Sequence, residues 1–153
     1  MTANSTLRAG DGAGRPAKPF VRHLPTAARF LMGLMFFVFG LNGFLQFIPQ
    51  PTTPMPEGAA AFAGALMKTG FMMPLVMGTQ LIVGVFLLLN RFVPLALALI
   101  APIIVGIVSF HLFLAPSTIG PGVAVLVLEL YLAWSYRAAF RPMLAMRATP
   151  ATK

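Results

Sequence analysis

Four long apolar segments, separated by short polar or proline-containing turns, constrain the fold of this chain more than any other feature. They cover residues 25–48, 71–89, 92–114 and 122–140, and each approaches the roughly 20 residues that a helix needs to cross a hydrocarbon layer of about 30 Å. Within a single segment, only a helix satisfies every backbone polar group, as lipid requires. The segments therefore predict an all-α membrane protein with a bundle of four transmembrane helices.

The composition argues against a soluble globular domain. Hydrophobic residues make up 58% of the 153 residues and charged residues only 9%, whereas soluble domains carry roughly 25% charged residues. The chain has no cysteine, which excludes disulfides, thiolate metal ligands and cysteine-held iron–sulfur clusters. Any redox role therefore requires a bound cofactor or a partner that carries the electrons.

The distribution of Lys and Arg predicts the orientation in the membrane. Most of the basic residues behind the net charge of +8 lie near the chain ends or at Arg91, whereas the opposite side carries only Lys68. Because cytoplasmic loops are enriched in Lys and Arg, we expect a multi-pass protein of the bacterial inner membrane with both termini in the cytoplasm. The basic residues do not alternate with aromatic ones along a stripe, so we expect no nucleic-acid partner.

The segments outside the spans divide the chain into three parts. Residues 1–20 have no apolar period and predict a disordered basic cytoplasmic tail, residues 21–142 form the membrane domain, and residues 143–153 are a second basic cytoplasmic tail. Several prolines end the first span in the first outer loop. The following segment, 57–68, predicts a short extra helix that covers the outer end of the bundle.

Each span supplies at least one polar side chain, and such groups usually face the interior of a bundle. Counting 1.5 Å of rise per residue places them all in the outer half of the membrane. We therefore predict one polar pocket, open to the outer side, with Glu129 at its base. Glu129 is interpreted as a proton carrier, a ligand anchor or half of an ion pair with His111. The alternative is that these residues only hydrogen-bond across helices. The predicted pocket residues are Asn42, Gln46, Gln80, His111 and Glu129.

Arg29 lies near the cytoplasmic end of the first span. Its side chain either snorkels to the headgroups or contacts an anionic ligand or a carbonyl of another helix. Gly33 and Gly40 share one helix face and predict a close approach of a second helix there. We expect no metal site, because His23 and His111, the two histidines, belong to opposite ends of the bundle.

The residues Arg29-Phe-Leu-Met-Gly33 and Phe39-Gly40-Leu-Asn-Gly43 resemble the opening helix of the DoxX family. The proline-rich loop, the short helix around Phe62–Leu66 and the second span, with Gln80 and Gly84 leading to Arg91, continue the likeness. The segment 25–140 is thus similar to a DoxX-like four-helix membrane protein. Residue by residue, the resemblance carries over to Arg29, Gly33, Gly40 and Gln80.

The resemblance implies a membrane partner in redox or stress-response assemblies. Our first hypothesis is accordingly a non-catalytic membrane subunit that contacts the lipid bilayer, a partner protein and further copies of itself. The second is a quinone-binding oxidoreductase subunit, similar to the membrane subunit of thiosulfate:quinone oxidoreductase, with quinone as the cofactor. The third is a small-solute or proton-coupled carrier that uses Glu129.

Overall fold

The structure, a computed structural model, describes residues 19–49 and 54–143, and all regular structure in this part of the chain is helical. The predicted tails 1–20 and 143–153 lie outside these residues except at Pro19, Phe20 and Met143. The helices are α1 (Pro19–Leu45), α2 (Glu57–Lys68), α3 (Met72–Leu88), α4 (Val93–Phe113), the 3₁₀ turn η1 (Pro116–Thr118), α5 (Ile119–Ser135) and the short α6 (Arg137–Phe140).

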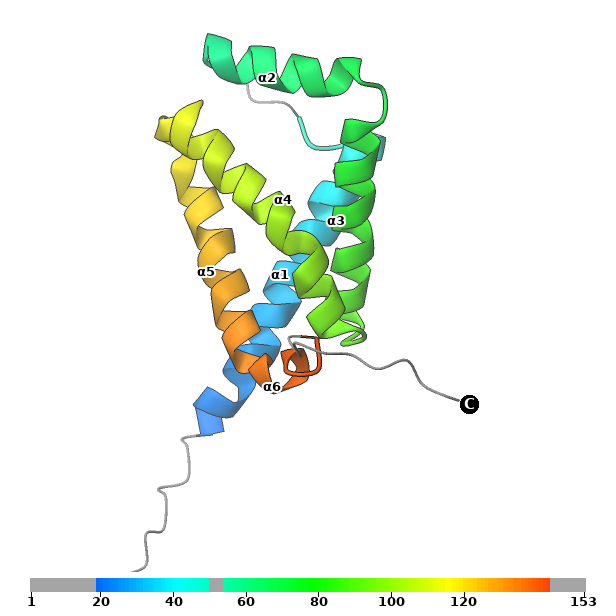
Figure 1. Ribbon diagram of the computed structural model, residues 1–153, viewed down its shortest axis with the longest axis vertical. Helices are drawn as coiled ribbons and strands as arrows, with labels where there is room; N and C mark the ends of the chain where they lie inside the picture. The colour runs from blue at the N-terminus through cyan, green and yellow to red at the C-terminus, as the bar shows by residue number, and fades with distance from the viewer. Residues whose placement is uncertain (1–18, 50–53, 144–153) are drawn as a thin grey trace, which may run out of the picture.

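Three of these helices are long and apolar enough to cross a membrane. They are α1 from His23 onward, α4, and η1 continued into α5. The fourth candidate is α3, whose 17 residues extend about 26 Å. It is joined to α2 by a bend of 90°, so that α2 lies across one end of the molecule (Figure 1). The part of the chain that the structure describes therefore has three to four candidate spans, as expected of a multi-pass membrane protein.

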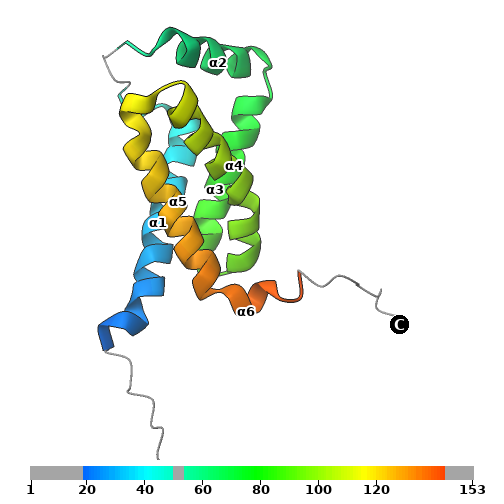
Figure 2. The ribbon, with the colours of Figure 1, turned by 60° about the vertical axis from the view of Figure 1, so that its left-hand side comes forward.

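Helices α1 and α3 form the most extensive helix pair, and they lie side by side in both views (Figures 1 and 2). Glycines permit this approach. A Cβ atom on Gly40 would lie 2.6 Å from the backbone nitrogen of Leu81, and one on Gly84 would meet the backbone of Phe37. Gly33 faces the same interface, where a Cβ atom would lie 3.0 Å from a side-chain atom of α3. The close approach predicted from Gly33 and Gly40 is confirmed, and α3 is the partner.

Helices α1, α3, α4 and α5 all contribute to the hydrophobic core. Helix α4 packs against both α3 and α5, and α5 also contacts α1. The largest of the fully buried side chains lie mainly toward the end of the molecule that carries α6: Met32, Val83, Leu87, Leu97, Ile100, Ile104 and Leu132. Toward its C-terminal end, α4 diverges from α3 (Figure 1). Residues of α2, α3 and α4 line a cavity there.

The two ends of the molecule carry different charges. Figures 1 and 2 show α2 at one end, and the α3–α4 turn, α6 and the start of α1 at the other. We call these the α2 end and the α6 end. In the described part of the chain, Arg91, Arg137 and Arg141 lie at the α6 end, and Arg29 lies close to it. The α2 helix carries Glu57 and Lys68.

Helix α1 begins at Pro19, whereas the sequence predicted a start at Pro25. Proline suits the first position of a helix, because its missing N–H would have no intrahelical partner there. Both prolines satisfy this rule, and Pro19 takes the position. Pro25 lies inside the helix, where it removes one backbone hydrogen bond. The prediction was wrong because the rule does not distinguish two nearby prolines.

The fourth apolar segment was predicted to continue to residue 140, but α5 ends at Ser135. Ser135 Oγ donates a hydrogen bond to the carbonyl of Tyr131 at 2.8 Å. The guanidinium of Arg137 donates to the carbonyl of Trp134 at 3.0 Å and lies 4.8 Å from the centre of its ring. These polar groups bond carbonyls of the last turn of α5, and the chain turns into α6. This end of α5 lies closer to Glu129 than predicted.

Candidate functional site

The five residues predicted to form one polar pocket lie in three separate places. Gln80 and His111 line a cavity between α2, α3 and α4, which we call the α2 cavity. Glu129 lines a different space, the Glu129 pocket, between α4, α5 and α6. The two spaces have no lining residue in common, and neither is lined by Asn42 or Gln46. The prediction of a single pocket with Glu129 at its base was therefore wrong.

Helix α4 separates the two spaces because it presents a different face to each. Pro102 and Gly106 line the α2 cavity, whereas the neighbouring Ala101 and Val105 line the Glu129 pocket. The length of α5 also affects the depth of Glu129. Because α5 ends at Ser135, Glu129 lies about 9 Å from the C-terminal end of the helix and about 15 Å from its first residue, Ile119. Glu129 therefore lies closer to the α6 end than to the α2 end.

The α2 cavity has a volume of about 530 Å³ and is almost entirely apolar. Its walls include Phe62 from α2, Met77 from α3 and Phe110 from α4, and the two phenylalanine rings lie 5.9 Å apart. Gly106 also lines the cavity, and a Cβ atom built on it would have nothing within 4 Å. Its missing side chain helps to leave the cavity open.

Gln80 and His111 are the only polar side chains among the described residues that line the α2 cavity. Gln80 is buried, with only 7% of its surface exposed. His111 Nδ1 lies 2.9 Å from Thr118 Oγ1, whose hydroxyl donates to the carbonyl of Ala115 at 3.0 Å. The Thr118 oxygen therefore accepts from Nδ1–H, and we assign Nε2 as an acceptor. The cavity thus offers amide donors and one imidazole acceptor.

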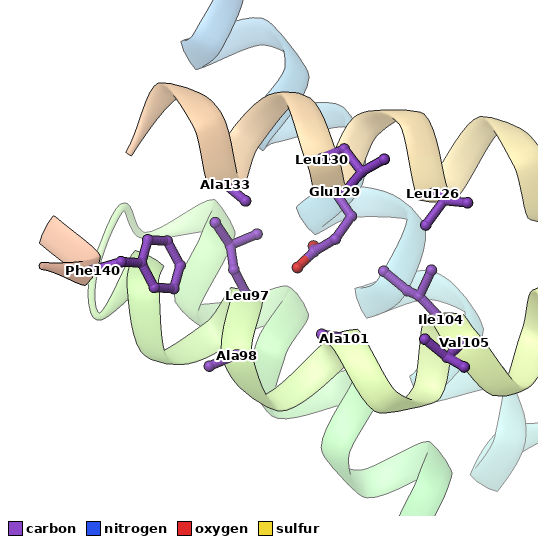
Figure 3. Close-up of a pocket in the computed structure, with 10 residues that line it drawn as sticks. All are labelled: Leu97, Ala98, Ala101, Ile104, Val105, Leu126, Glu129, Leu130, Ala133 and Phe140. Carbon is purple, nitrogen blue, oxygen red and sulfur yellow. The ribbon is translucent and has the colours of Figure 1, made fainter. Parts of the chain in front are cut away.

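The Glu129 pocket has a volume of about 320 Å³. Figure 3 shows the Glu129 carboxyl group extending from α5 toward α4, between apolar side chains of both helices. Glu129 is only 7% exposed, and its Oε2 has no hydrogen-bond partner in residues 19–49 and 54–143. The proposed ion pair with His111 does not form, because His111 lines the α2 cavity and bonds Thr118.

Asn42 and Gln46 lie at the end of α1 that faces α2. Asn42 Oδ1 accepts a hydrogen bond of 2.7 Å from the backbone N–H of Ile48. The backbone N–H of Gln46 donates to the carbonyl of Asn42 at 2.8 Å, and Gln46 adopts a left-handed conformation with φ of 49°. Asn42 therefore shapes the end of α1, while the Gln46 side chain is exposed. Neither side chain forms the cross-helix bond considered from the sequence.

Arg29 is buried and connects α1 to the last turn of α3. Its guanidinium donates to the carbonyl of Leu87 and, at 3.5 Å, to that of Leu88. This is the contact with a carbonyl of another helix that the sequence left open as an alternative to snorkelling. A cation is also favoured at the C-terminus of a helix, where the partial charge of the backbone is negative. Arg29 thus fixes α1 against the end of α3.

The sequence interpretation missed the aromatic and sulfur-containing walls of the α2 cavity. Phe62, Met77 and Phe110 line this cavity but were not among the predicted pocket residues. The one available signal was the expectation that residues 57–68 cover an end of the bundle, because a covering helix brings its own side chains over the space beneath. That signal did not identify which methionines and phenylalanines line the space.

Comparisons with protein-family models, with curated proteins and with solved structures gave no match. The resemblance to the DoxX family therefore rests on the sequence motifs alone.

Proposed function

We propose that this chain is a DoxX-like protein of the bacterial inner membrane that crosses it four times, with both termini in the cytoplasm. We propose further that it is a membrane subunit of a redox or stress-response assembly rather than an enzyme on its own. The charge difference between the α6 end and the α2 end supports the orientation, because Lys and Arg favour the cytoplasmic side. The absence of cysteine supports a role in which a partner carries out the redox step.

The ligand that best fits the α2 cavity is a quinone. The observation that carries this proposal is an apolar cavity of about 530 Å³ whose polar side chains are Gln80 and His111 alone. Ligand sites typically have volumes of about 300–1,000 Å³ and combine apolar walls with a few polar groups. The amide N–H groups of Gln80 suit a quinone carbonyl, and Nε2 of His111 suits the hydroxyl of the reduced form.

The walls of the cavity also suit a flat ring. Aromatic rings attract one another in tilted or offset arrangements, and methionine sulfur packs favourably against ring edges. Phe62, Phe110 and Met77 provide both kinds of contact. A quinone is lipid-soluble, and it therefore reaches such a cavity from the bilayer, where a water-soluble substrate does not accumulate.

Filling the α2 cavity tests the ligand proposal. Leucine at Gly106 projects into the cavity without a clash at Cβ, so we expect the amount of bound quinone to fall to background. The measurement is organic extraction of the purified protein followed by mass spectrometry, expressed as moles of quinone per mole of chain. Gly78→Leu is the matched control, because Gly78 has no atom within 4 Å of a built Cβ and does not line the cavity.

The proposal is wrong if the wild-type protein contains no more quinone than Gly106→Leu, while Gly78→Leu matches the wild type. The same preparation reports on the subunit role. A second protein that co-purifies at a constant ratio in mild detergent supports that role, and recovery of the chain alone contradicts it.

A further inference from the structure

The Glu129 pocket contains a buried carboxyl group that is not part of the proposed quinone site. Glu129 is 93% buried, given its exposure of 7%, and Oε2 has no partner among the described residues. The other residues that line the pocket are apolar, from Leu97 and Ala101 on α4 to Phe140 on α6 (Figure 3). The pocket shares no residue with the α2 cavity, so this carboxyl group needs a separate explanation.

A carboxyl oxygen without a partner is costly in apolar surroundings, and its ionised form even more so. The surrounding helices cannot remove this cost, because the N–H groups inside them are already bonded within each helix. An acyl chain in the pocket cannot remove it either, since hydrocarbon has no donor. A ligand that donates an N–H or O–H to Glu129 can do so.

The pocket is accessible from the side of the molecule. Val105 and Leu130, which line it, are 60% and 61% exposed. Both lie on candidate membrane spans, so this side faces acyl chains when α4 and α5 cross the bilayer. A ligand for this pocket therefore enters from the membrane and must itself partition into lipid.

We propose that the Glu129 pocket binds a lipophilic ammonium ion, with the charged nitrogen on the Glu129 carboxylate and the apolar body among the side chains of α4, α5 and α6. Charge-assisted hydrogen bonds of this type are about twice as strong as neutral ones. The volume of about 320 Å³ lies at the lower end of the roughly 300–1,000 Å³ typical of ligand sites. The ligand is therefore small, with about one ring and a short chain.

Glu129 is the only titratable side chain among the residues that line the pocket. Arg141, which follows Phe140 in the chain, is exposed. Arg29, on the neighbouring α1, bonds carbonyls of α3, Arg137 bonds the carbonyl of Trp134, and Tyr131 and Tyr136 pack against the core. A proton on Glu129 competes with the ammonium ion for the same oxygens. Binding therefore weakens as the pH is lowered.

The test is calorimetric titration of the purified full-length chain in mild detergent with 4-phenylbutylammonium. The neutral alcohol 4-phenylbutanol serves as the matched probe, because it keeps the ring and chain but lacks the charge. We expect one ammonium site per chain, affinity about tenfold or more above that for the alcohol, and weaker binding at acidic pH. Glu129→Gln removes this preference, whereas Glu57→Gln, an exposed change in α2, retains it.

The inference is overturned if the two probes bind equally, if Glu129→Gln binds the ammonium ion as tightly as the wild type, or if no binding exceeds that of empty micelles. Equal binding of both probes identifies the pocket as a site for lipid chains. If Glu129→Gln does not fold, the comparison of the charged and the neutral probe on the wild-type protein still shows whether the ammonium ion is preferred. The result is independent of the quinone proposal, which concerns the other cavity.

Discussion

Replacing Gly84 by alanine is expected to lower the free energy of unfolding by about 1–3 kcal/mol, the usual cost of adding atoms to a tightly packed interface. The added Cβ atom meets the backbone of Phe37 on α1. A backbone cannot rotate aside as a side chain can, so α1 and α3 must separate. This pair is the most extensive in the molecule, and thermal unfolding in mild detergent measures the loss.

Gly78→Ala is the matched control for this change. It lies on the same helix and gains the same helix propensity, about 1 kcal/mol relative to glycine. Its Cβ atom has no neighbour within 4 Å, so we expect stability equal to or above that of the wild type. If Gly84→Ala and Gly78→Ala unfold at the same temperature, then α1 and α3 do not pack as described.

Replacing Arg29 by leucine is expected to cost about 1.5–3 kcal/mol, the contribution of a hydrogen bond to a charged group. The guanidinium donates to the carbonyls of Leu87 and Leu88 at the end of α3. Without it, the carbonyl of Leu87 keeps only the 3.3 Å bond from the backbone N–H of Asn90. Thermal unfolding in the same detergent measures the difference from the wild type.

Arg91→Leu separates this bond from the effect of charge. Arg91 is exposed in the turn between α3 and α4, so the change removes one positive charge from the same end of the molecule without removing a buried bond. We expect it to change stability by less than about 0.5 kcal/mol, as surface substitutions usually do. Equal destabilisation by both variants contradicts the role assigned to Arg29.

Local sequence signals were sufficient to locate the helices. The extra helix at 57–68 has the predicted bounds, and α4 lies within one residue of the predicted span at each end. Runs of apolar residues and the prolines that interrupt them are properties of neighbouring positions, so the helices that they define can be predicted from the sequence. The tight turn at Asn90 is also local, because asparagine tolerates the left-handed conformation, here with φ of 54°.

The arrangement of the polar side chains was not predictable in the same way. Depth along a helix can be counted from its ends, but the helix face that a residue occupies in the packed molecule depends on its neighbours. Ala101 and Pro102 are adjacent in sequence, yet they line different spaces. Gln80 and Glu129 were assigned to one pocket because the count along each helix placed both in the outer half of the membrane, whereas α4 lies between the two spaces.

The glycines differ in how closely a neighbouring helix approaches them. Gly33 and Gly40 indicated a close helix contact, and the structure contains it. The sequence did not identify the partner helix, which depends on tertiary packing. Gly106, by contrast, borders an open cavity, and a Cβ atom built on it would meet no atom within 4 Å. A small residue permits close packing but does not require it.

We propose that α3 crosses the membrane, with α2 and η1 on the outer side and the α3–α4 turn and α6 in the cytoplasm. The chain contains no cysteine, so single cysteines can be introduced and labelled in spheroplasts with a membrane-impermeant maleimide. We predict that Ala61→Cys in α2 and Ser117→Cys in η1 react from outside. Leu89→Cys, directly after α3, and Ala139→Cys in α6 should react only after permeabilisation. Labelling of Ala61→Cys and Leu89→Cys from the same side would contradict the claim.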